Sequence, residues 1–73
     1  MKIYRREDTR GRSLTEFDSI GDIRFVVVAG EGDVRSGLDV AHVAAGDAVR
    51  WSAGEEHETT TETGLVAIVI EPA

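Results

Sequence analysis

His57 is the residue of this chain that points most directly to chemistry, because an imidazole among carboxylates can bind a transition metal or move a proton. It stands between Glu56 and Glu58. A catalytic metal would need two or three further His, Asp or Glu ligands converging on it. In an extended segment, alternation places Thr59 and Thr61 on the face of His57 and the two glutamates on the other face. We therefore interpret His57 as a hydrogen-bonded histidine in a polar interior, and keep a metal site built around it as the alternative.

His42 is the second histidine and the other candidate metal ligand. The two imidazoles could meet only if the strands that carry them are neighbours, and two histidines without a carboxylate would bind a metal weakly. A solvent-facing or packing role is the simpler interpretation of His42. The acidic residues near His57 lack the spacing of a calcium-binding loop and are interpreted as a solvated turn and strand edge. They are Glu55, Glu56, Glu58 and Glu62.

Trp51 and Phe25 could line a small apolar pocket, and Arg50 could bind a carboxylate or phosphate group through both guanidinium edges. A chain with only 5% aromatic residues needs them for its core, and arginines near acidic residues commonly form surface ion pairs. The same two interpretations apply to Tyr4, Phe17, Arg24 and Arg35. If the protein binds a ligand, we expect it to contact His57, Trp51, Arg50 and Phe25.

The sequence predicts no catalytic residue. It contains no cysteine, which excludes a thiol nucleophile, a thiolate zinc site and a disulfide scaffold. The four serines lack the Gly-x-Ser-x-Gly context of an activated nucleophile; they are Ser13, Ser19, Ser36 and Ser52. The segment Gly30-Glu31-Gly32 is not followed by a helix-forming sequence, so it is not a phosphate-binding loop.

Charge and hydropathy exclude two classes of partner. The 73 residues include 14 acidic and 8 basic side chains and carry a net charge of −6, whereas nucleic-acid binding requires a basic surface. The longest apolar runs, Phe25–Gly30 and Gly64–Ile70, are too short to span a bilayer. The charged N-terminal residues do not form a secretory signal. We expect a cytoplasmic protein with no nucleic-acid or membrane partner.

The elements that must position these residues are short strands. Nine valines and five isoleucines lie in runs separated by Gly-containing turns, which is typical of an all-β sandwich or small barrel. Gly30-Glu31-Gly32 is predicted to break one strand from the next, and Ser36-Gly37 to form a two-residue hairpin turn. The predicted strands are Ile3–Arg6, Leu14–Phe17, Ile23–Ala29, Asp33–Arg35, Leu38–Val43, Ala48–Trp51, His57–Thr61 and Leu65–Ile70.

Two glycines and a histidine are spaced as in a known motif. Gly46 is followed after five residues by Ser52, and then by Gly54 and His57. This spacing resembles the second motif of the cupins, G-x5-P-x-G-x2-H-x3-N, with Ser52 in place of the proline and Thr61 in place of the asparagine. The segment 27–34 resembles the hairpin that ends the first motif of the family. The resemblance covers about residues 22–70 and implies a small jelly-roll barrel.

The departures from the cupin pattern bear on function. The first cupin motif supplies two histidines and a glutamate that complete a metal site with the histidine of the second motif. The glutamate position corresponds here to Ile23 or Phe25, and no histidine precedes it. Residues 1–19 correspond only to abbreviated N-terminal strands, so the resemblance implies a barrel that lacks about a third of its strands.

We therefore expect a single domain over residues 1–73, a small cupin-like jelly roll or partial β-barrel of antiparallel strands. Missing strands leave open sheet edges, and a 73-residue chain buries only about 60% of its unfolded surface. Dimerisation is the simplest way to complete such a barrel. The function expected is that of a non-catalytic homodimer, without a cofactor, that binds a small ligand or a protein partner. The alternative is a metal-dependent cupin enzyme, of the dioxygenase or isomerase type, with a single divalent transition metal at His57.

Overall fold

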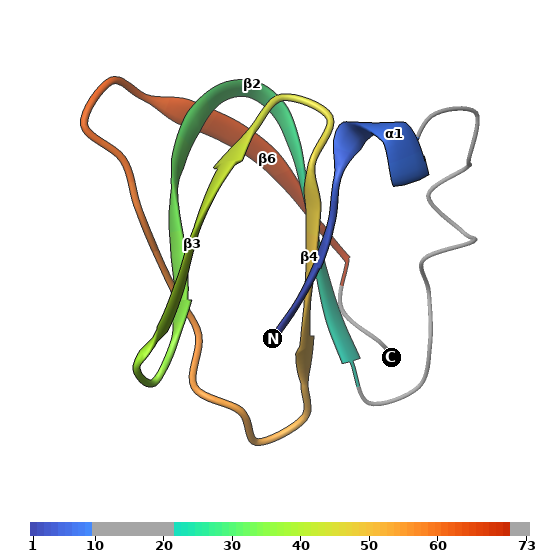
Figure 1. Ribbon diagram of the computed structural model, residues 1–73, viewed down its shortest axis with the longest axis vertical. Coiled ribbons are helices and arrows are strands. Elements are labelled where there is room, and N and C mark those ends of the chain that lie inside the picture. The colour runs from blue at the N-terminus through green and yellow to red at the C-terminus, as the bar shows by residue number, and fades with distance from the viewer. Residues whose placement is uncertain (10–21, 71–73) are drawn as a thin grey trace.

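The computed structural model describes residues 1–9 and 22–70 and is built from antiparallel β-strands with one short helix (Figure 1). The all-β class predicted from the sequence is confirmed. The elements are β1 (Lys2–Tyr4), α1 (Arg6–Thr9), β2 (Asp22–Ser36), β3 (Asp39–Ala44), β4 (Ala48–Ser52), β5 (Glu58–Thr60) and β6 (Leu65–Ile70). The predicted strand Leu14–Phe17 lies outside the described residues.

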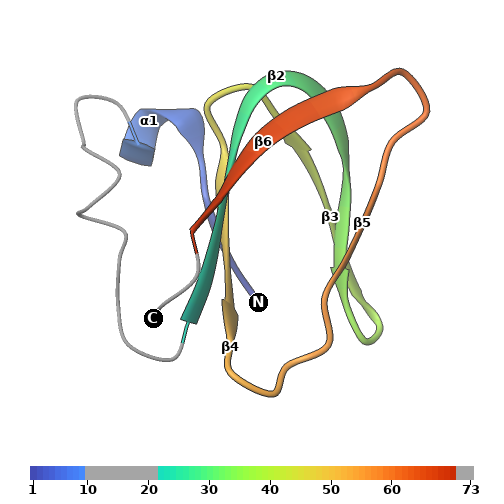
Figure 2. The same cartoon turned by 180° about the vertical axis from the view of Figure 1, so that it is seen from behind.

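Strand β2 is the spine of a curled half-barrel, because it pairs with four other strands and bends into an arch (Figure 1). Its first half lies between β4 and β6, and its second half between β3 and β5. Strand β1 adds to the free side of β4. Both ends of the arch point the same way, so the connection from β4 to β5 spans the open end of the half-barrel (Figures 1 and 2).

The predicted break at Gly30-Glu31-Gly32 is wrong, since β2 continues through it as one strand of 15 residues. The register with β6 shifts between Val27 and Ala29, which is a bulge, and Gly30 follows with a φ of +80°. Bulges and positive-φ glycines increase the local bend of a strand. The glycines therefore curve β2 instead of ending it.

The core lies in the concavity of the arch. It consists of the buried residues Phe25, Val27, Val34, Val43, Val49 and Trp51. Alternation along β2 and β4 turns these side chains inward, and the N-terminal residues Met1 and Ile3 pack against them. The Phe25 and Trp51 rings meet edge to face, with centroids 5.9 Å apart. This small core sets the position of Trp51 beneath the open end.

Three further local predictions differ from the structure. The hairpin turn is Gly37-Leu38, one residue later than predicted, because Ser36 still pairs with Asp39. The first strand ends at Tyr4, and Arg6, the last residue of the predicted strand Ile3–Arg6, begins the helical turn α1. Strand β5 starts at Glu58, so His57 belongs to the preceding connection.

In the part of the chain that the structure describes, no helix is long and apolar enough to cross a membrane.

Candidate functional site

An open groove lies at the mouth of the half-barrel, between the β2–β3 hairpin and the β4–β5 connection. We call it the mouth groove; its volume is about 590 Å³. It is lined by Arg35, Gly37, Ser52, Gly54, Glu55, Glu56, His57 and Glu58. The groove therefore contains the histidine that the sequence singles out, together with side chains of both charges.

His57 lies against Trp51, with ring centroids 5.2 Å apart and planes inclined by 39°. Trp51 is only 2% exposed and belongs to the core. Its Nε1–H is buried and donates to no acceptor in the structure. A buried donor left unpaired costs about 1–3 kcal/mol. His57 thus lies against an indole whose N–H has no acceptor among the described residues.

Glu55 has a structural role at the same mouth. Its carboxylate accepts hydrogen bonds from the ammonium group of Met1 and the hydroxyl of Ser36, and the backbone N–H of Ser52 donates to it at 3.0 Å. The ammonium contact, followed by the Ser36 and Ser52 hydrogen bonds, lowers the pKa of Glu55 to about 2. Glu55 is therefore a fixed carboxylate that joins the N-terminus, the hairpin and the β4–β5 connection.

The structure brings together some of the predicted ligand contacts. His57 and Trp51 are in ring contact, and Phe25 supports Trp51 from within the core. Arg50 does not line the mouth groove; it lies on β4 opposite Lys2 of β1. Arg35, which the sequence analysis treats as a possible anion-binding residue, does line it. The sequence analysis did not identify Ser52 as a groove residue.

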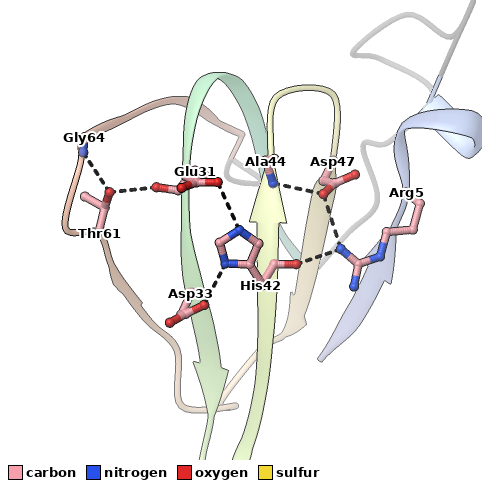
Figure 3. A network of polar contacts seen from close by, with 8 residues as sticks. All are labelled: Arg5, Glu31, Asp33, His42, Ala44, Asp47, Thr61 and Gly64. Atoms are coloured by element: carbon pink, nitrogen blue, oxygen red, sulfur yellow. Dashed lines mark hydrogen bonds and ion pairs between the residues drawn. The ribbon is translucent and has the colours of Figure 1, made fainter.

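The second histidine belongs to a different set of contacts. His42 on β3 lies opposite Asp33 of β2, and its Nδ1 is 3.0 Å from a carboxylate oxygen of Asp33 (Figure 3). Its Nε2 is 3.3 Å from a carboxylate oxygen of Glu31. The hydrogen bond to Asp33, and then the one to Glu31, raises the pKa of His42. A pocket of about 280 Å³ beside these residues is lined also by Thr60 and Thr61.

The two histidines do not share a site. Strand β3 pairs with one side of the second half of β2, whereas β5, which follows His57, pairs with the other side. His57 lines the mouth groove and His42 lines the second pocket. Both ring nitrogens of His42 face carboxylates of β2, those of Asp33 and Glu31, and not the ring of His57.

A buried carboxylate holds the N-terminal segment against the sheet. Asp47 accepts hydrogen bonds from the backbone N–H of Ala44 and of Arg6, both at 3.0 Å, and from Nη1 of Arg5 at 3.3 Å. Arg5 Nη1 also donates to the backbone carbonyl of His42 at 2.7 Å (Figure 3). These contacts join the β1–α1 corner to the turn between β3 and β4.

The described side chains do not fit the metal centre that the cupin resemblance implies. Among the side chains that the structure describes, no three of His, Cys, Asp or Glu are placed to hold one metal ion. The positions matching the glutamate of the first motif are Ile23 and Phe25, which offer no donor atom. His57 is therefore an isolated donor with respect to that site.

Comparisons with known proteins give this chain no relative. No family model matches it, and neither a curated protein nor a solved structure is significantly similar to it.

Proposed function

We propose that this protein is a cupin-like, non-catalytic binding domain that works as a homodimer and holds a small polar ligand in its mouth groove. The observation that carries the proposal is the contact between His57 and Trp51 at the groove. An exposed imidazole there covers a buried indole whose N–H has no acceptor. Binding sites commonly combine an aromatic surface with a few polar groups that orient the ligand.

The cupin-like character is supported by where the motif residues lie. Gly46 and Gly54 have φ values of +96° and +83° and occupy the turns on either side of β4. His57 follows at the mouth of a curled antiparallel sheet. The spacing of the motif thus corresponds to a turn–strand–turn unit that delivers a histidine to the open end of the half-barrel.

The groove chemistry favours a ligand with groups of both signs. Arg35 provides a cationic donor on one side, and Glu56 and Glu58 provide carboxylate acceptors on either side of His57 in the chain. A guanidinium binds carboxylates well, and carboxylates accept hydrogen bonds from ammonium and hydroxyl groups. The volume of about 590 Å³ lies within the usual range for small-molecule sites. A free amino acid or a compound of similar size and charge has the matching groups.

No described geometry favours the metal-dependent enzyme. His57 has no convergent ligands, and a carboxylate with a pKa of about 2, such as Glu55, is a weak general base near neutral pH. Protein purified without a histidine tag should therefore contain metal well below one equivalent. One equivalent of a transition metal, lost in His57→Ala, would contradict the non-catalytic proposal.

The single tryptophan provides the test for ligand binding. Titration with free amino acids and small hydroxylated amines at millimolar concentration should change the fluorescence of Trp51, since His57 lines the groove and is in ring contact with it. His57→Ala should abolish the change, and His42→Ala, in the other pocket, should retain it. Circular dichroism confirms that both variants fold. An unchanged response in His57→Ala, or no response to any compound of the panel, would overturn the proposed groove function.

A further inference from the structure

Among the described residues, β6 is an edge strand of the sheet. In the part of the chain that the structure describes, β6 pairs only with β2, along residues Arg24–Gly30 (Figure 2). Every second residue of β6 directs its backbone N–H and C=O away from β2. Such groups are a template for another extended strand.

The edge carries none of the features that normally prevent association. The six residues of β6, LVAIVI, include no charge, proline or glycine. Val66 and Ile68 are 60% and 41% exposed on one face, and Val69 is 54% exposed on the other. Val28, at the bulge in β2, adds a further valine that is 49% exposed. Apolar side chains are thus exposed on both faces of the same strand.

The other edges differ in charge. Strand β1 contains Lys2, β3 contains Asp39 and His42, and β5 contains Glu58. Among the edge strands in the described ranges, β6 alone has no ionisable side chain. The protein has a net charge of −6, so two copies repel each other overall, and an uncharged edge is where they can meet without adding local like-charge contacts.

We infer that β6 pairs antiparallel with β6 of a second copy and forms the interface of the homodimer. Antiparallel pairing of a strand with itself is symmetric about a two-fold axis and needs no second kind of surface. With Ile68 opposite Ile68 of the second copy, Val66 lies opposite Ile70 and Ala67 opposite Val69. Every cross-strand pair within residues 66–70 is then apolar, and no like charges face each other there. The pairing joins two half-barrel sheets and places apolar neighbours beside the exposed side chains of β6 on both faces.

This inference rests on the homodimer in the proposed function, and lysine substitutions separate the two. Light scattering on the full chain should give a dimer at micromolar concentration. Ile68→Lys and Val66→Lys should convert it to a monomer, because an ammonium group at the interface loses its hydration. Val40→Lys is the matched control, since Val40 is 51% exposed on another edge strand, β3. It should remain dimeric.

Cysteine cross-linking tests the register independently, in a chain that has no cysteine of its own. Under mild oxidation Ile68→Cys should form a covalent dimer, because directly opposite Cβ atoms approach disulfide distance. Val40→Cys should not. A wild-type monomer would overturn both this inference and the homodimer. A dimer that persists in both lysine variants, or is lost equally in Val40→Lys, would overturn the β6 interface alone. Trp51 fluorescence reports groove binding separately in each case.

Discussion

At the scale of single residues, two side chains at the mouth of the half-barrel, Glu55 and His57, have different roles. Glu55 is held by an ammonium group, a hydroxyl and a backbone N–H. His57, two positions along the same connection, faces the groove and contacts an indole. The first residue fixes the connection, and the second is exposed to whatever enters the groove. The contacts of Glu55 thus anchor the connection that carries His57.

The depressed pKa of Glu55 predicts part of the acid sensitivity of the protein. Its pKa falls from 4.5 to about 2 on folding, so the folded state favours the ionised form. The resulting stability is fully present above pH 4.5 and is lost as the pH falls towards 2. Glu55→Gln should lower the free energy of unfolding at pH 6. It should also make the dependence of this free energy on pH less steep between pH 4.5 and pH 2. Urea unfolding at a series of pH values measures both effects.

Acetylation of the amino terminus provides a second way to perturb the same contact. It removes the positive charge that contributes most to the shift, so the pKa of Glu55 should rise and the acid-dependent loss should shrink. An unchanged pH dependence in both Glu55→Gln and the acetylated protein would show that this contact contributes nothing to stability in solution.

Residue types were enough to predict some of this site. The scarcity of aromatics correctly placed Trp51 and Phe25 in the core. Motif spacing singled out His57, but its predicted place in a polar interior is wrong, because the side chain is exposed at the groove. The role of Glu55 was not predictable, because its main partner lies 54 residues away and is the chain terminus. His42 was also difficult, since a solvent-facing histidine gives no sign in the sequence that two carboxylates of a neighbouring strand will bind it.

At the scale of elements, β2 determines how everything else is arranged. A single strand that pairs with β4 and β6 in its first half and with β3 and β5 in its second half must bend for the sheet to enclose a core. Gly30 lies at that bend. A Cβ atom added there would be 2.2 Å from the carbonyl oxygen of Gly64, which accepts a hydrogen bond from the N–H of Glu31. The bend and the close approach of the β5–β6 connection both depend on this glycine.

Two alanine substitutions separate backbone strain from steric contact. Gly54 has a φ of +83°, similar to the +80° of Gly30, but nothing lies within 4 Å of its added Cβ. Gly54→Ala should cost about 1–2 kcal/mol from backbone strain alone. Gly30→Ala should cost at least about twice as much, because the strand must also move away from Gly64. Chemical denaturation measures both, and equal losses would contradict the steric argument.

The sequence predicted a strand correctly where the local residue pattern agrees with the strand pairing in the fold. The apolar run Leu65–Ile70, between Gly64 and Glu71-Pro72, gave the bounds of β6 correctly. The division of β2 was wrong because glycines usually interrupt strands, whereas here pairing on both sides outweighs the local preference. The helical turn Arg6–Thr9 was missed because four polar residues carry no periodic apolar signal.

At the scale of the whole molecule, stability depends on joining distant segments around a small core. A domain of 73 residues has a free energy of unfolding of about 4–11 kcal/mol, so individual anchors are a large share of it. Val34 and Val49 are fully buried, and the N-terminal segment is attached to the sheet by β1, by the contact of Met1 with Glu55 and by the contacts of Asp47. We regard Asp47 as the anchor that keeps β1 on the half-barrel.

Asp47→Ala should therefore destabilise the protein by about 2–4 kcal/mol, because it removes a buried acceptor from two backbone N–H groups and a guanidinium. Asp39→Ala, an exposed aspartate in the β2–β3 hairpin, should change stability by less than about 0.5 kcal/mol. Hydrogen exchange should accelerate in residues 1–9 of the Asp47 variant before it does so in β2, since the anchor serves the N-terminal segment first. Uniform acceleration across the sheet would instead show that Asp47 supports the core as a whole and not the attachment of β1.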